Sequence, residues 1–568
     1  MINTICTDKT GTLTENKMKV EIIYSNGKIL KNLSICSKEI INNFCINSTA
    51  DIKKNGKDKY MILGDPIEAA ILFFYEKFKK YINDSNIKNL NYFNIRKKAK
   101  IKYKYPFSSE EKIMATAVNE DNKIVIYYKG SPEKILNNSI YINNKDKNVV
   151  DIKIEKEKIL KKISKFQDKS KRVIAFSHKI IEGEIDYTNN KNKIFNNMIF
   201  DGFVVLDDPI KKGVFKALRD CINSGINIKM ITGDNKKTAN SIARRLKIIN
   251  NKKDISLDGF KLEKIDEKKI IKNMERIKVI YRSTPYTKLK LINILKKMKK
   301  VVAFIGDGVN DVLALKNSDV GISMGKTGTD IARSVSDLIL LNDSFSTIVY
   351  AINWGRGIHD NFKRFIQFQL TVNISSLIII LISIFLNSTS PFSALQLLWI
   401  NIIMDGPLAI ALGLEPIRNN LMNRKPINRN SNIITKKMII KIFLNSTLIL
   451  FLFFYQYFNN ILKFNGDLNQ EKTILFCIFI LVNLFNSFNC RELENKSIFN
   501  NFYSNKIMIV IFFLTFFIQI IIVQYFGFLF NIVSIDFITW IKIIFYTFLI
   551  ILIPEIYYLI YKAFKKYC

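Results

Sequence analysis

The pattern of apolar and polar residues changes near residue 360. In residues 1–360, short apolar runs alternate with polar, Lys-rich stretches. Beyond this point lie long apolar segments, namely Phe365–Leu386, Ala394–Gly413, Met438–Phe458, Ile474–Asn489, Ile507–Phe526 and Trp540–Tyr561. Most of them approach the roughly 20 residues that a helix needs to cross a bilayer. We therefore expect a soluble α/β part followed by an all-α domain of six transmembrane helices.

Several short apolar runs in the first part end in turns rich in Asp, Gly and Thr. The first run begins at Ile2, and the others are Ile226–Ile231, Val301–Ile305 and Val320–Met324. Helical patterns separate these runs, and strand–helix alternation predicts a doubly wound parallel sheet. Ligands of such sheets gather at the carboxyl ends of the strands. The polar residues that follow the runs should therefore share one crevice: Asp8, Thr232, Asp307 and Asp311.

The spacing of these runs also predicts the domain order. A long insertion separates the first strand from the rest of the sheet. We expect the sheet domain to comprise residues 1–17 and 204–352, and the inserted domain to comprise residues 18–203. Residues 353–568 should form a stalk and the six membrane helices.

The charge of the chain is strongly basic, with 86 Lys and Arg against 49 Asp and Glu, a net charge of +37. The chain is rich in Lys, Asn and Ile throughout, and cytoplasmic loops of membrane proteins collect Lys and Arg. We therefore do not expect a nucleic-acid partner. Basic residues cluster between the second and third apolar segments: Arg418, Arg424, Lys425, Arg429, Lys436 and Lys437. This bias predicts a multi-pass protein with both termini in the cytoplasm. We further expect its membrane to be the plasma membrane.

Polar residues inside the apolar segments are candidates for an ion pathway, because such residues are costly in a bilayer. Asp405 is the clearest, Asn401 precedes it by four residues, and Asn373 lies in the preceding segment. Gly406-Pro407 should break the helix directly after Asp405 and free carbonyl oxygens to face an ion. These hard oxygen ligands are the kind that Ca²⁺ prefers.

The motifs around the strand ends resemble those of a known family. Asp8–Thr14 reads DKTGTLT, Thr232–Asp234 reads TGD and Gly306–Asp311 reads GDGVND. In this order they resemble the P-type ATPases, a branch of the haloacid-dehalogenase-like phosphotransferases. The resemblance implies that Asp8 is the nucleophile that accepts the γ-phosphate of ATP.

The same resemblance implies roles for the surrounding residues. Mg²⁺ would bind Asp8, the carbonyl of Thr10 and Asp307, with Asp311 supporting the site. Lys288 would stabilise charge on the transferred group. Residues expected to contact ATP or its phosphates are Thr232, Gly233, Asp234 and Asn310. Related phosphatases carry a general acid–base Asp where this chain has Thr10, so the acyl-phosphate should persist.

The insertion resembles the family's nucleotide-binding domain. Lys129-Gly130 begins a KGSPE segment similar to the KGAPE motif of the ATP pocket. Phe107–Lys112 resembles the segment whose phenylalanine stacks on adenine, and base stacking contributes on the order of 1–3 kcal/mol. Gly64–Glu68 resembles another family marker, and Arg172 matches a phosphate-contacting arginine. We therefore expect Phe107, Lys112, Lys129, Gly130 and Arg172 to bind ATP. Lys211 stands where the family usually has Arg.

The membrane segments resemble those of the plasma-membrane (type IIB) Ca²⁺ pumps, on Phe368–Asn373, Leu398–Asp405 and Leu484–Asn489. The transported ion would then be Ca²⁺, bound by Asn373, Asn401 and Asp405. Two alternatives stay open. One is a pump for H⁺, Mn²⁺ or Na⁺, and the other is a pump remnant that does not transport.

The resemblance covers the chain but not the family's whole architecture. Nothing in the sequence matches the actuator domain or the first four membrane helices, so we interpret the chain as truncated at its N-terminal side. We expect it to bind ATP but not to complete a transport cycle alone. A separate polypeptide carrying the missing part is one partner to expect, beside the lipid bilayer.

Overall fold

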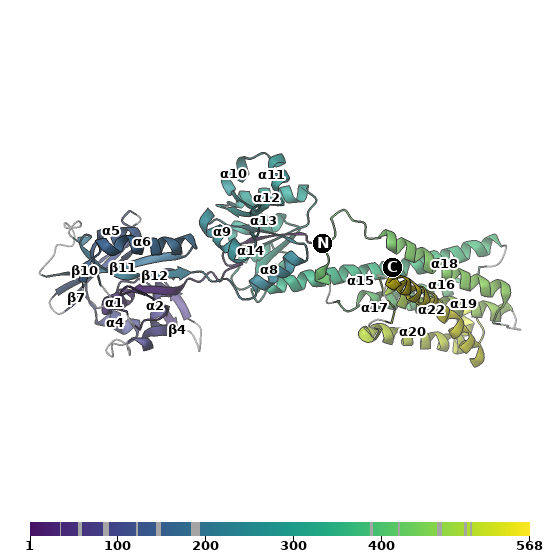
Figure 1. The fold of residues 1–568 in the computed structure, drawn as a ribbon. Coiled ribbons are helices and arrows are strands. Elements are labelled where there is room, and N and C mark those ends of the chain that lie inside the picture. The colour runs from purple at the N-terminus through teal and green to yellow at the C-terminus, as the bar shows by residue number, and fades with distance from the viewer. Residues whose placement is uncertain are drawn as a thin grey trace. The chain divides into compact units, whose positions relative to one another are not determined.

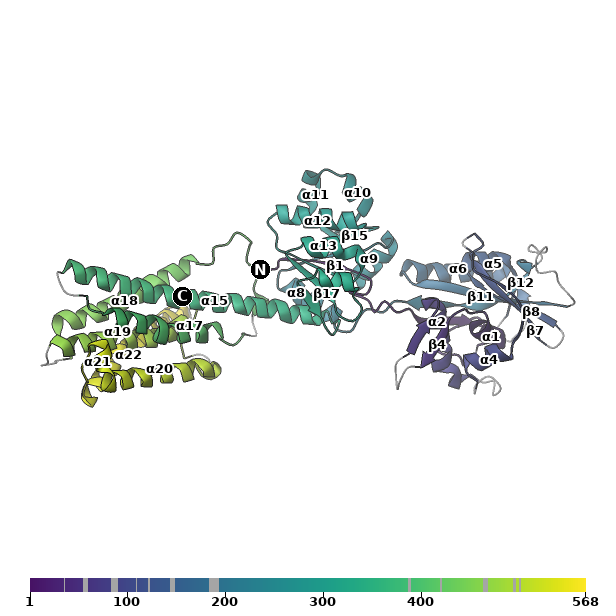
Figure 2. The same cartoon turned by 180° about the vertical axis from the view of Figure 1, so that it is seen from behind.

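The computed structural model describes residues 1–34, 36–54, 60–82, 90–108, 110–120, 123–143, 149–182, 194–386, 390–418, 421–462, 468–493, 497–499 and 502–567. These residues form two compact units, Ile2–Ile348 and Val349–Cys568 (Figures 1 and 2). Ser109, within the predicted adenine-stacking segment, lies outside the described residues.

The first unit contains a parallel sheet of seven strands in the order β14-β15-β13-β1-β16-β17-β18. Its strands are β1 (Thr4–Asp8), β13 (Asn227–Ile231), β14 (Ile255–Asp258), β15 (Ile277–Tyr281), β16 (Val302–Gly306), β17 (Val320–Met324) and β18 (Leu338–Leu340). β1 lies at the centre and pairs in parallel with β13 and β16. The chain passes from one side of β1 to the other between β15 and β16, so the predicted doubly wound parallel sheet is confirmed.

Helices connect these strands, and their apolar faces fill the core of the sheet. They are α8 (Val214–Asn223), α9 (Lys236–Arg245), α10 (Gly259–Lys264), α11 (Glu267–Asn273), α12 (Pro285–Lys297), α13 (Val312–Asn317) and α14 (Asp330–Ser334). Thr284 caps the N-terminus of α12: its hydroxyl accepts the N–H of Thr287, and Pro285 occupies the first turn of the helix. Capping of this kind fixes where the helix starts, and hence where Lys288 lies.

A second, nine-stranded sheet is built from the insertion. Its strands are β2 (Lys19–Ser25), β3 (Lys28–Leu30), β6 (Lys100–Tyr105), β7 (Ile113–Glu120), β8 (Lys123–Gly130), β9 (Ser139–Asn143), β10 (Val149–Asp151), β11 (Arg172–Ile181) and β12 (Met198–Asp207). Most pairings are antiparallel, whereas β12 and β9 run parallel. A two-stranded sheet, β4 (Asp51–Lys54) with β5 (Tyr60–Leu63), accompanies it.

Helices cover both faces of this second sheet (Figures 1 and 2). One face carries α1 (Lys38–Ile46), α2 (Pro66–Phe78) and α4 (Tyr92–Lys98), and the other carries α5 (Pro132–Asn138) and α6 (Lys153–Asp168). Each face has its own buried cluster, with Tyr127 on the α1 side and Tyr128 on the α5 side. Successive residues of a strand point to opposite faces, which explains this division. The predicted inserted α+β domain is confirmed.

The second unit is all-helical and contains six helices long and apolar enough to cross a membrane. They are α15 (Ser346–Phe385), α16 with α17 (Ala394–Trp399 and Gly406–Gly413), α18 (Lys436–Asn459), α19 (Leu468–Cys490), α20 (Lys506–Tyr525) and α22 (Phe537–Tyr567). A short helix, α21 (Gly527–Phe530), precedes α22. The six expected membrane helices are thus confirmed, and the protein is a multi-pass membrane protein. α19 is longer than the predicted Ile474–Asn489.

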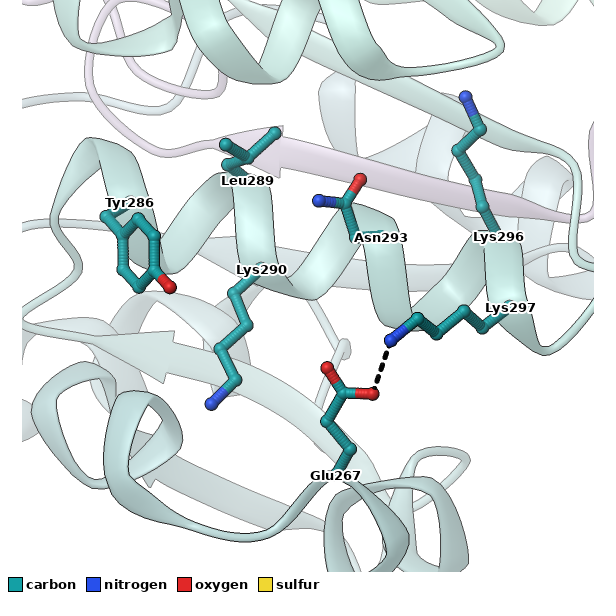
Figure 3. Close-up of a pocket in the computed structure, with 7 residues that line it drawn as sticks. All are labelled: Glu267, Tyr286, Leu289, Lys290, Asn293, Lys296 and Lys297. Carbon is teal, nitrogen blue, oxygen red and sulfur yellow. Dashed lines mark hydrogen bonds and ion pairs between the residues drawn. The ribbon is translucent and has the colours of Figure 1, made fainter.

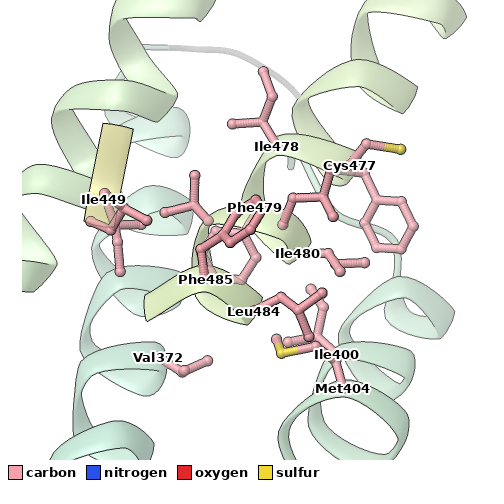
Figure 4. Close-up of a cluster of buried hydrophobic side chains, with 14 of the residues drawn as sticks. Val372, Ile400, Met404, Ile449, Cys477, Ile478, Phe479, Ile480, Leu484 and Phe485 are labelled. Atoms are coloured by element: carbon pink, nitrogen blue, oxygen red, sulfur yellow. The ribbon is translucent and has the colours of Figure 1, made fainter. Parts of the chain in front are cut away.

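The core of the helical unit is centred on α19, whose membrane-length stretch is entirely buried. Figure 4 shows Phe479 and Leu484 of α19 among side chains of other helices, including Ile449 of α18 and Met404. A helix that is apolar on all sides is expected at the centre of a bundle.

The predicted helix break after Asp405 is wrong. Residues Ile400–Asp405 form a π-helical turn, and α17 continues directly from Gly406. Pro407 lies in the first turn of α17, where its missing N–H is tolerated. The helix is therefore deformed at this point rather than broken.

Candidate functional site

A charged cluster lies at the carboxyl end of the central strand β1. Asp8 ends this strand, and the Lys288 ammonium on α12 donates to Asp8 Oδ2 at 2.5 Å and to Asp311 Oδ1 at 2.6 Å. The other carboxylate oxygen of Asp311 accepts the backbone N–H groups of Asp307 and Gly308 at 3.2 and 3.3 Å. The buried Lys288 therefore joins Asp8, 280 positions before it in the chain, to Asp311, 23 positions after it.

The turn after β1 explains why Gly11 is needed. The N–H of Lys9 donates to Asp8 Oδ1 at 2.5 Å, and the carbonyl of Lys9 accepts the N–H groups of Leu13 and Thr14. Gly11 has φ +71°, and a Cβ at this position would lie 1.7 Å from Asp307 Oδ2. Only glycine allows this conformation and this close approach. The turn therefore brings its backbone directly against the Asp307 carboxylate, and Thr10 in it is half-buried.

Burial and nearby charges shift the pKa values of the groups in this cluster. Burial raises the pKa of Asp8, with Asp311 adding to the rise and Lys288 opposing it. Burial, together with Asp8 and Asp311, raises the pKa of Asp307 to about 7. Burial alone would lower the pKa of Lys288, but the two carboxylates that it contacts outweigh burial and raise it. Ionising all the carboxylates of this cluster together is therefore unfavourable unless a further positive charge joins Lys288.

A divalent cation would supply this further positive charge. Hard carboxylate oxygens at the edge of a cleft are the ligands that Mg²⁺ prefers. The turn that carries Thr10 also lies directly against Asp307, because a Cβ at Gly11 would overlap its carboxylate. The residues present therefore fit the predicted Mg²⁺ site.

The predicted phosphate-binding residues are also at this edge. Thr232 follows β13; it is buried, and its hydroxyl accepts the N–H of Asp234 at 3.2 Å. Gly233 is exposed, and a Cβ there would meet only Ser283 O at 3.9 Å. Asp234 pairs with Lys9 at 2.6 Å. Asn310 is exposed in the turn Val309–Asp311.

Three residues of this region escaped the sequence prediction. Lys9 was not expected to pair with Asp234. Lys211, noted only as a departure from the family pattern, donates to the carbonyl of Gly11 and, at 3.4 Å, to that of Asp343. The carboxylate of Asp343 accepts N–H groups of Lys326 and Thr327 at 2.8 and 2.9 Å. Asp343 closely follows an apolar run, β18, and that signal could have identified it.

The second sheet brings together most of the predicted nucleotide-binding residues. The carbonyl of Lys112 accepts the N–H of Ser131 at 3.0 Å, and a Cβ at Gly130 would lie 2.3 Å from that carbonyl. The segment ending at Lys112 therefore lies against Lys129-Gly130. Phe107 is 61% exposed, and an exposed ring is available for stacking. Arg172 is exposed at the start of β11, three residues before Ala175, the partner of Gly130.

Lys129 is buried, in contrast to these exposed residues. Its ammonium donates to Glu68 Oε1 at 2.6 Å and to the carbonyl of Asn47 at 2.5 Å. Burial alone would raise the pKa of Glu68, but Lys129 and the Thr49 donors lower it to about 2. Burial lowers the pKa of Lys129, and Glu68 opposes that shift. The low pKa of Glu68 keeps its carboxylate ionised at neutral pH.

In the helical unit, the predicted ion ligands differ in burial. Asp405 is fully buried, and its Oδ2 accepts a hydrogen bond from Gln369, which the sequence prediction missed. Asp405 Oδ1 is buried and has no hydrogen-bond partner among the described residues. Asn373 and Asn401 are both exposed. An orphaned carboxylate oxygen in an apolar bundle is a candidate cation ligand.

A surface pocket of about 450 Å³ lies against α12 (Figure 3). Its lining consists of Glu267, Tyr286, Leu289, Lys290, Asn293, Lys296 and Lys297. Lys297 and Glu267 form an ion pair of 2.7 Å across it. α12 thus contributes Lys288 to the buried cluster and also lines this pocket.

Comparisons with known proteins agree with both units. Residues 36–213 match the family model "P-type ATPase, cytoplasmic domain N", and residues 389–560 match "Cation transporting ATPase, C-terminus". The chain is 34% identical over 547 residues to a putative plasma membrane-type calcium-transporting ATPase 13 of Arabidopsis thaliana, covering 92% of this chain and 51% of that protein. It is 32% identical over 527 residues to the human calcium-transporting ATPase type 2C member 1, covering 88% and 53%. The chain spans about half the length of the curated relatives it matches.

Proposed function

The chain belongs to the P-type ATPase family, and from this premise we propose that it is the ATP-binding, phosphorylated and membrane-spanning part of a Ca²⁺-transporting ATPase. The observation that carries the proposal is the Lys288 ammonium between Asp8 and Asp311 at the carboxyl edge of the parallel sheet. A carboxylate beside a fixed cation can act as a nucleophile toward a phosphate whose charge that cation neutralises.

In the proposed reaction, a carboxylate oxygen of Asp8 attacks the γ-phosphorus of ATP. The bond from that phosphorus to the β,γ-bridging oxygen breaks, ADP leaves with the bond electrons, and an aspartyl-phosphate remains on Asp8. Thr232, Gly233 and Lys288 hold the phosphoryl oxygens during transfer. Asp234 and Asn310 complete the surroundings of the phosphates. Thr10 cannot act as a general base, so the aspartyl-phosphate persists.

Asp8, Asp307, Asp311 and the carbonyl of Thr10 would hold Mg²⁺. When bound, the ion neutralises negative charge on the transferred group. Asp311 supports the site through the N–H groups of Asp307 and Gly308, which orient the turn that carries Asp307.

The insertion, with proposed bounds 18–203, would bind the nucleotide. Its contacts are Phe107 on adenine, and Lys112, Lys129, Gly130 and Arg172 around the rest of ATP. The close approach of Lys112 to Gly130 supports this grouping. The remaining proposed bounds are 1–17 with 204–352 for the phosphorylation domain and 353–568 for the stalk and membrane helices.

Ca²⁺ is the transported ion that the chemistry of the helical unit supports best. The buried, half-satisfied Asp405 supports a cation pathway, and Asn373 and Asn401 would add oxygen ligands. The named relatives are calcium-transporting ATPases. We place the protein in the plasma membrane, which plasma membrane-type relatives support. Both termini would lie in the cytoplasm, as the basic loops indicate. A polypeptide supplying the part of the relatives that this chain does not match is a proposed partner.

The ion can be tested through phosphorylation. The chain, reconstituted in lipid nanodiscs, is incubated with Mg²⁺ and [γ-³²P]ATP in the presence of Ca²⁺, Mn²⁺ or Na⁺, or at lowered pH. Acid-stable label that increases selectively with Ca²⁺, and not in Asp405→Asn, supports a Ca²⁺ pump. Selective stimulation by one of the other cations would instead identify that cation. Label that no cation changes would contradict a transport site at Asp405.

A further inference from the structure

The buried ammonium of Lys129 is held at the C-terminal end of helix α1. Asn47 follows this helix, and its carbonyl accepts from Lys129 at 2.5 Å. The last carbonyls of a helix lack partners within the helix and carry partial negative charge, so a lysine there is stabilised. Glu68 accepts a second bond at 2.6 Å. An ammonium has three N–H donors, so one is left without an acceptor among the residues that the structure describes.

The side chain of Asn47 fixes the position of its own carbonyl. Its amide nitrogen donates to Asn43 Oδ1 and to the carbonyl of Tyr127, each at 3.1 Å. Its amide oxygen accepts the hydroxyl of Thr116 at 2.9 Å. The residue is completely buried. These bonds tie the end of α1 to strands β7 and β8, the second of which carries Lys129.

The other acceptor, Glu68, depends on the same segment. Its Oε2 accepts the N–H of Thr49 at 2.5 Å, the N–H of Ala50 at 3.2 Å, and the hydroxyls of Ser48 and Thr49 at 3.2 and 2.9 Å. These donors directly follow Asn47 in the chain. Anchoring Asn47 therefore fixes the first acceptor of Lys129 and also the donors that orient the second.

We propose that Asn47 is a positioning residue for nucleotide binding: it contacts no ligand itself but fixes the two acceptors that aim the third N–H of Lys129 at a bound nucleoside triphosphate. This inference rests on the proposed function, in which Lys129 contacts ATP. Without the Asn47 amide, the carbonyl and the Ser48–Ala50 turn lose their anchor. Lys129 then occupies several orientations, and the bound nucleotide loses a fixed contact.

A double-mutant cycle on the full chain in nanodiscs tests the proposal, with the affinity for ATP measured by calorimetry. Asn47→Ser should weaken ATP binding about tenfold, and Lys129→Met should weaken it at least as much. Combining the two should add less than about twofold to the loss seen with Lys129→Met, because Asn47 acts only through Lys129. If Asn47 only stabilised the fold, the losses of ATP affinity in the two single variants would multiply in the double variant.

Two further variants keep the test interpretable. Asn42→Ser removes a buried asparagine of the same helix that donates to Tyr127 Oη at 3.2 Å and does not contact Lys129. Its ATP affinity should be unchanged. Thr116→Val conserves shape and removes only the hydroxyl donor to Asn47, so it serves if Asn47→Ser fails to fold. It should weaken binding in the Lys129 background and not in the Lys129→Met background.

The outcomes separate this inference from the proposed function. Unchanged affinity in Asn47→Ser, or equal losses in both backgrounds, would overturn the role of Asn47 while leaving Lys129 as an ATP contact. A Lys129→Met chain that binds ATP as tightly as the unaltered chain would overturn the nucleotide role of Lys129 itself, and this inference with it.

Discussion

Two buried aspartates in this chain, Asp311 and Asp405, have opposite surroundings. Asp311, in the α/β unit, is 1% exposed, and both of its oxygens have partners: the Lys288 ammonium on one side and two backbone N–H groups on the other. Asp405, in the helical unit, is fully buried, but only one oxygen has a partner, the Gln369 amide. A buried charge is costly unless it is paired and hydrogen-bonded.

The difference separates two kinds of site. The carboxylate of Asp311 is paired and hydrogen-bonded within its own unit, so the Asp8 cluster is preorganised. The carboxylate of Asp405 lacks a neutralising group among the residues that the structure describes around it. It therefore needs a cation or proton from outside the protein, as expected for a residue on an ion pathway.

Removing the Lys288 ammonium, which Asp8 and Asp311 share, should have the largest effect on phosphorylation. Lys288→Met leaves Asp8 and Asp311 facing each other without their ammonium, so phosphorylation from ATP should fall about 10²- to 10³-fold. Lys290→Met is the matched control, because Lys290 lies on the same helix but donates to the carbonyl of Glu263 at 2.7 Å. The rate of label incorporation measures both. Equal losses in the two variants would show that α12, rather than Lys288, is responsible.

A methyl group placed against the Asp307 carboxylate should have the next largest effect, on the Mg²⁺ requirement of phosphorylation. In Gly11→Ala, the new methyl would lie 1.7 Å from Asp307 Oδ2 in the present geometry, and φ is +71°. Asp307 must move, so we expect the Mg²⁺ concentration for half-maximal labelling to rise at least about tenfold. Gly355→Ala, which has nothing within 4 Å, is the control and should label normally. An unchanged Mg²⁺ requirement in Gly11→Ala would argue against Asp307 as a ligand.

Much of this cluster could be predicted from local sequence, and the reasons are physical. A parallel sheet gathers strand ends at one edge, so apolar runs followed by Asp or Thr were sufficient to group Asp8, Thr232, Asp307 and Asp311. Lys288 was identified only from the resemblance to the family, because the sequence of its own helix does not distinguish it from other lysines. The pairing of Lys9 with Asp234 depends on a turn geometry that no periodicity encodes.

The helical unit was less predictable beyond its six spans. Hydropathy located the spans, but it could not show that Gly406-Pro407 follows a π turn rather than a break. The partner Gln369 was missed, because pairing between separate helices depends on their packing. Hydropathy also could not predict that Asn373 and Asn401 are exposed, because exposure too depends on how the helices pack.

The contribution of the buried Lys129–Glu68 ion pair to stability should depend on pH, unlike that of a surface pair. The pKa of Glu68 is about 2 in the folded state and 4.5 as the ordinary value. The pair's contribution to stability is therefore present above about pH 4.5 and is lost as the pH falls through about 2. The unfolding midpoint of Glu68→Gln should be below that of the unaltered chain at pH 7, and the difference should shrink by pH 3.

Glu111→Gln is the control for this measurement, because the Glu111–Lys134 pair is exposed and 4.0 Å long. It should alter the midpoint little at either pH. A difference for Glu68→Gln that stays constant between pH 7 and pH 3 would show that the charge of Glu68 does not stabilise the fold.

The smallest effects on phosphorylation should come from Asp405. Because Asp8 and Asp405 lie in separate units, Asp405→Asn should change labelling measured without Ca²⁺ by less than about twofold. It should not lower the unfolding midpoint of the helical unit, because it removes a half-paired buried charge. Gln369→Leu should destabilise that unit by about 1–3 kcal/mol, because it leaves the carboxylate without its one partner. If Asp405→Asn by itself lowered the unfolding midpoint of the helical unit, Asp405 would be stabilised by its surroundings, as Asp311 is.

The most direct test of the account asks whether Asp8 carries the phosphate. The chain is incubated with ATP and Mg²⁺, treated with borohydride, which reduces an aspartyl-phosphate to homoserine, and sequenced by mass spectrometry. Phosphorylation of Asp8 should give homoserine at position 8, and none there in Asp8→Asn or without ATP. Homoserine at another position, or phosphate retained on a side chain after hydroxylamine treatment, would contradict it.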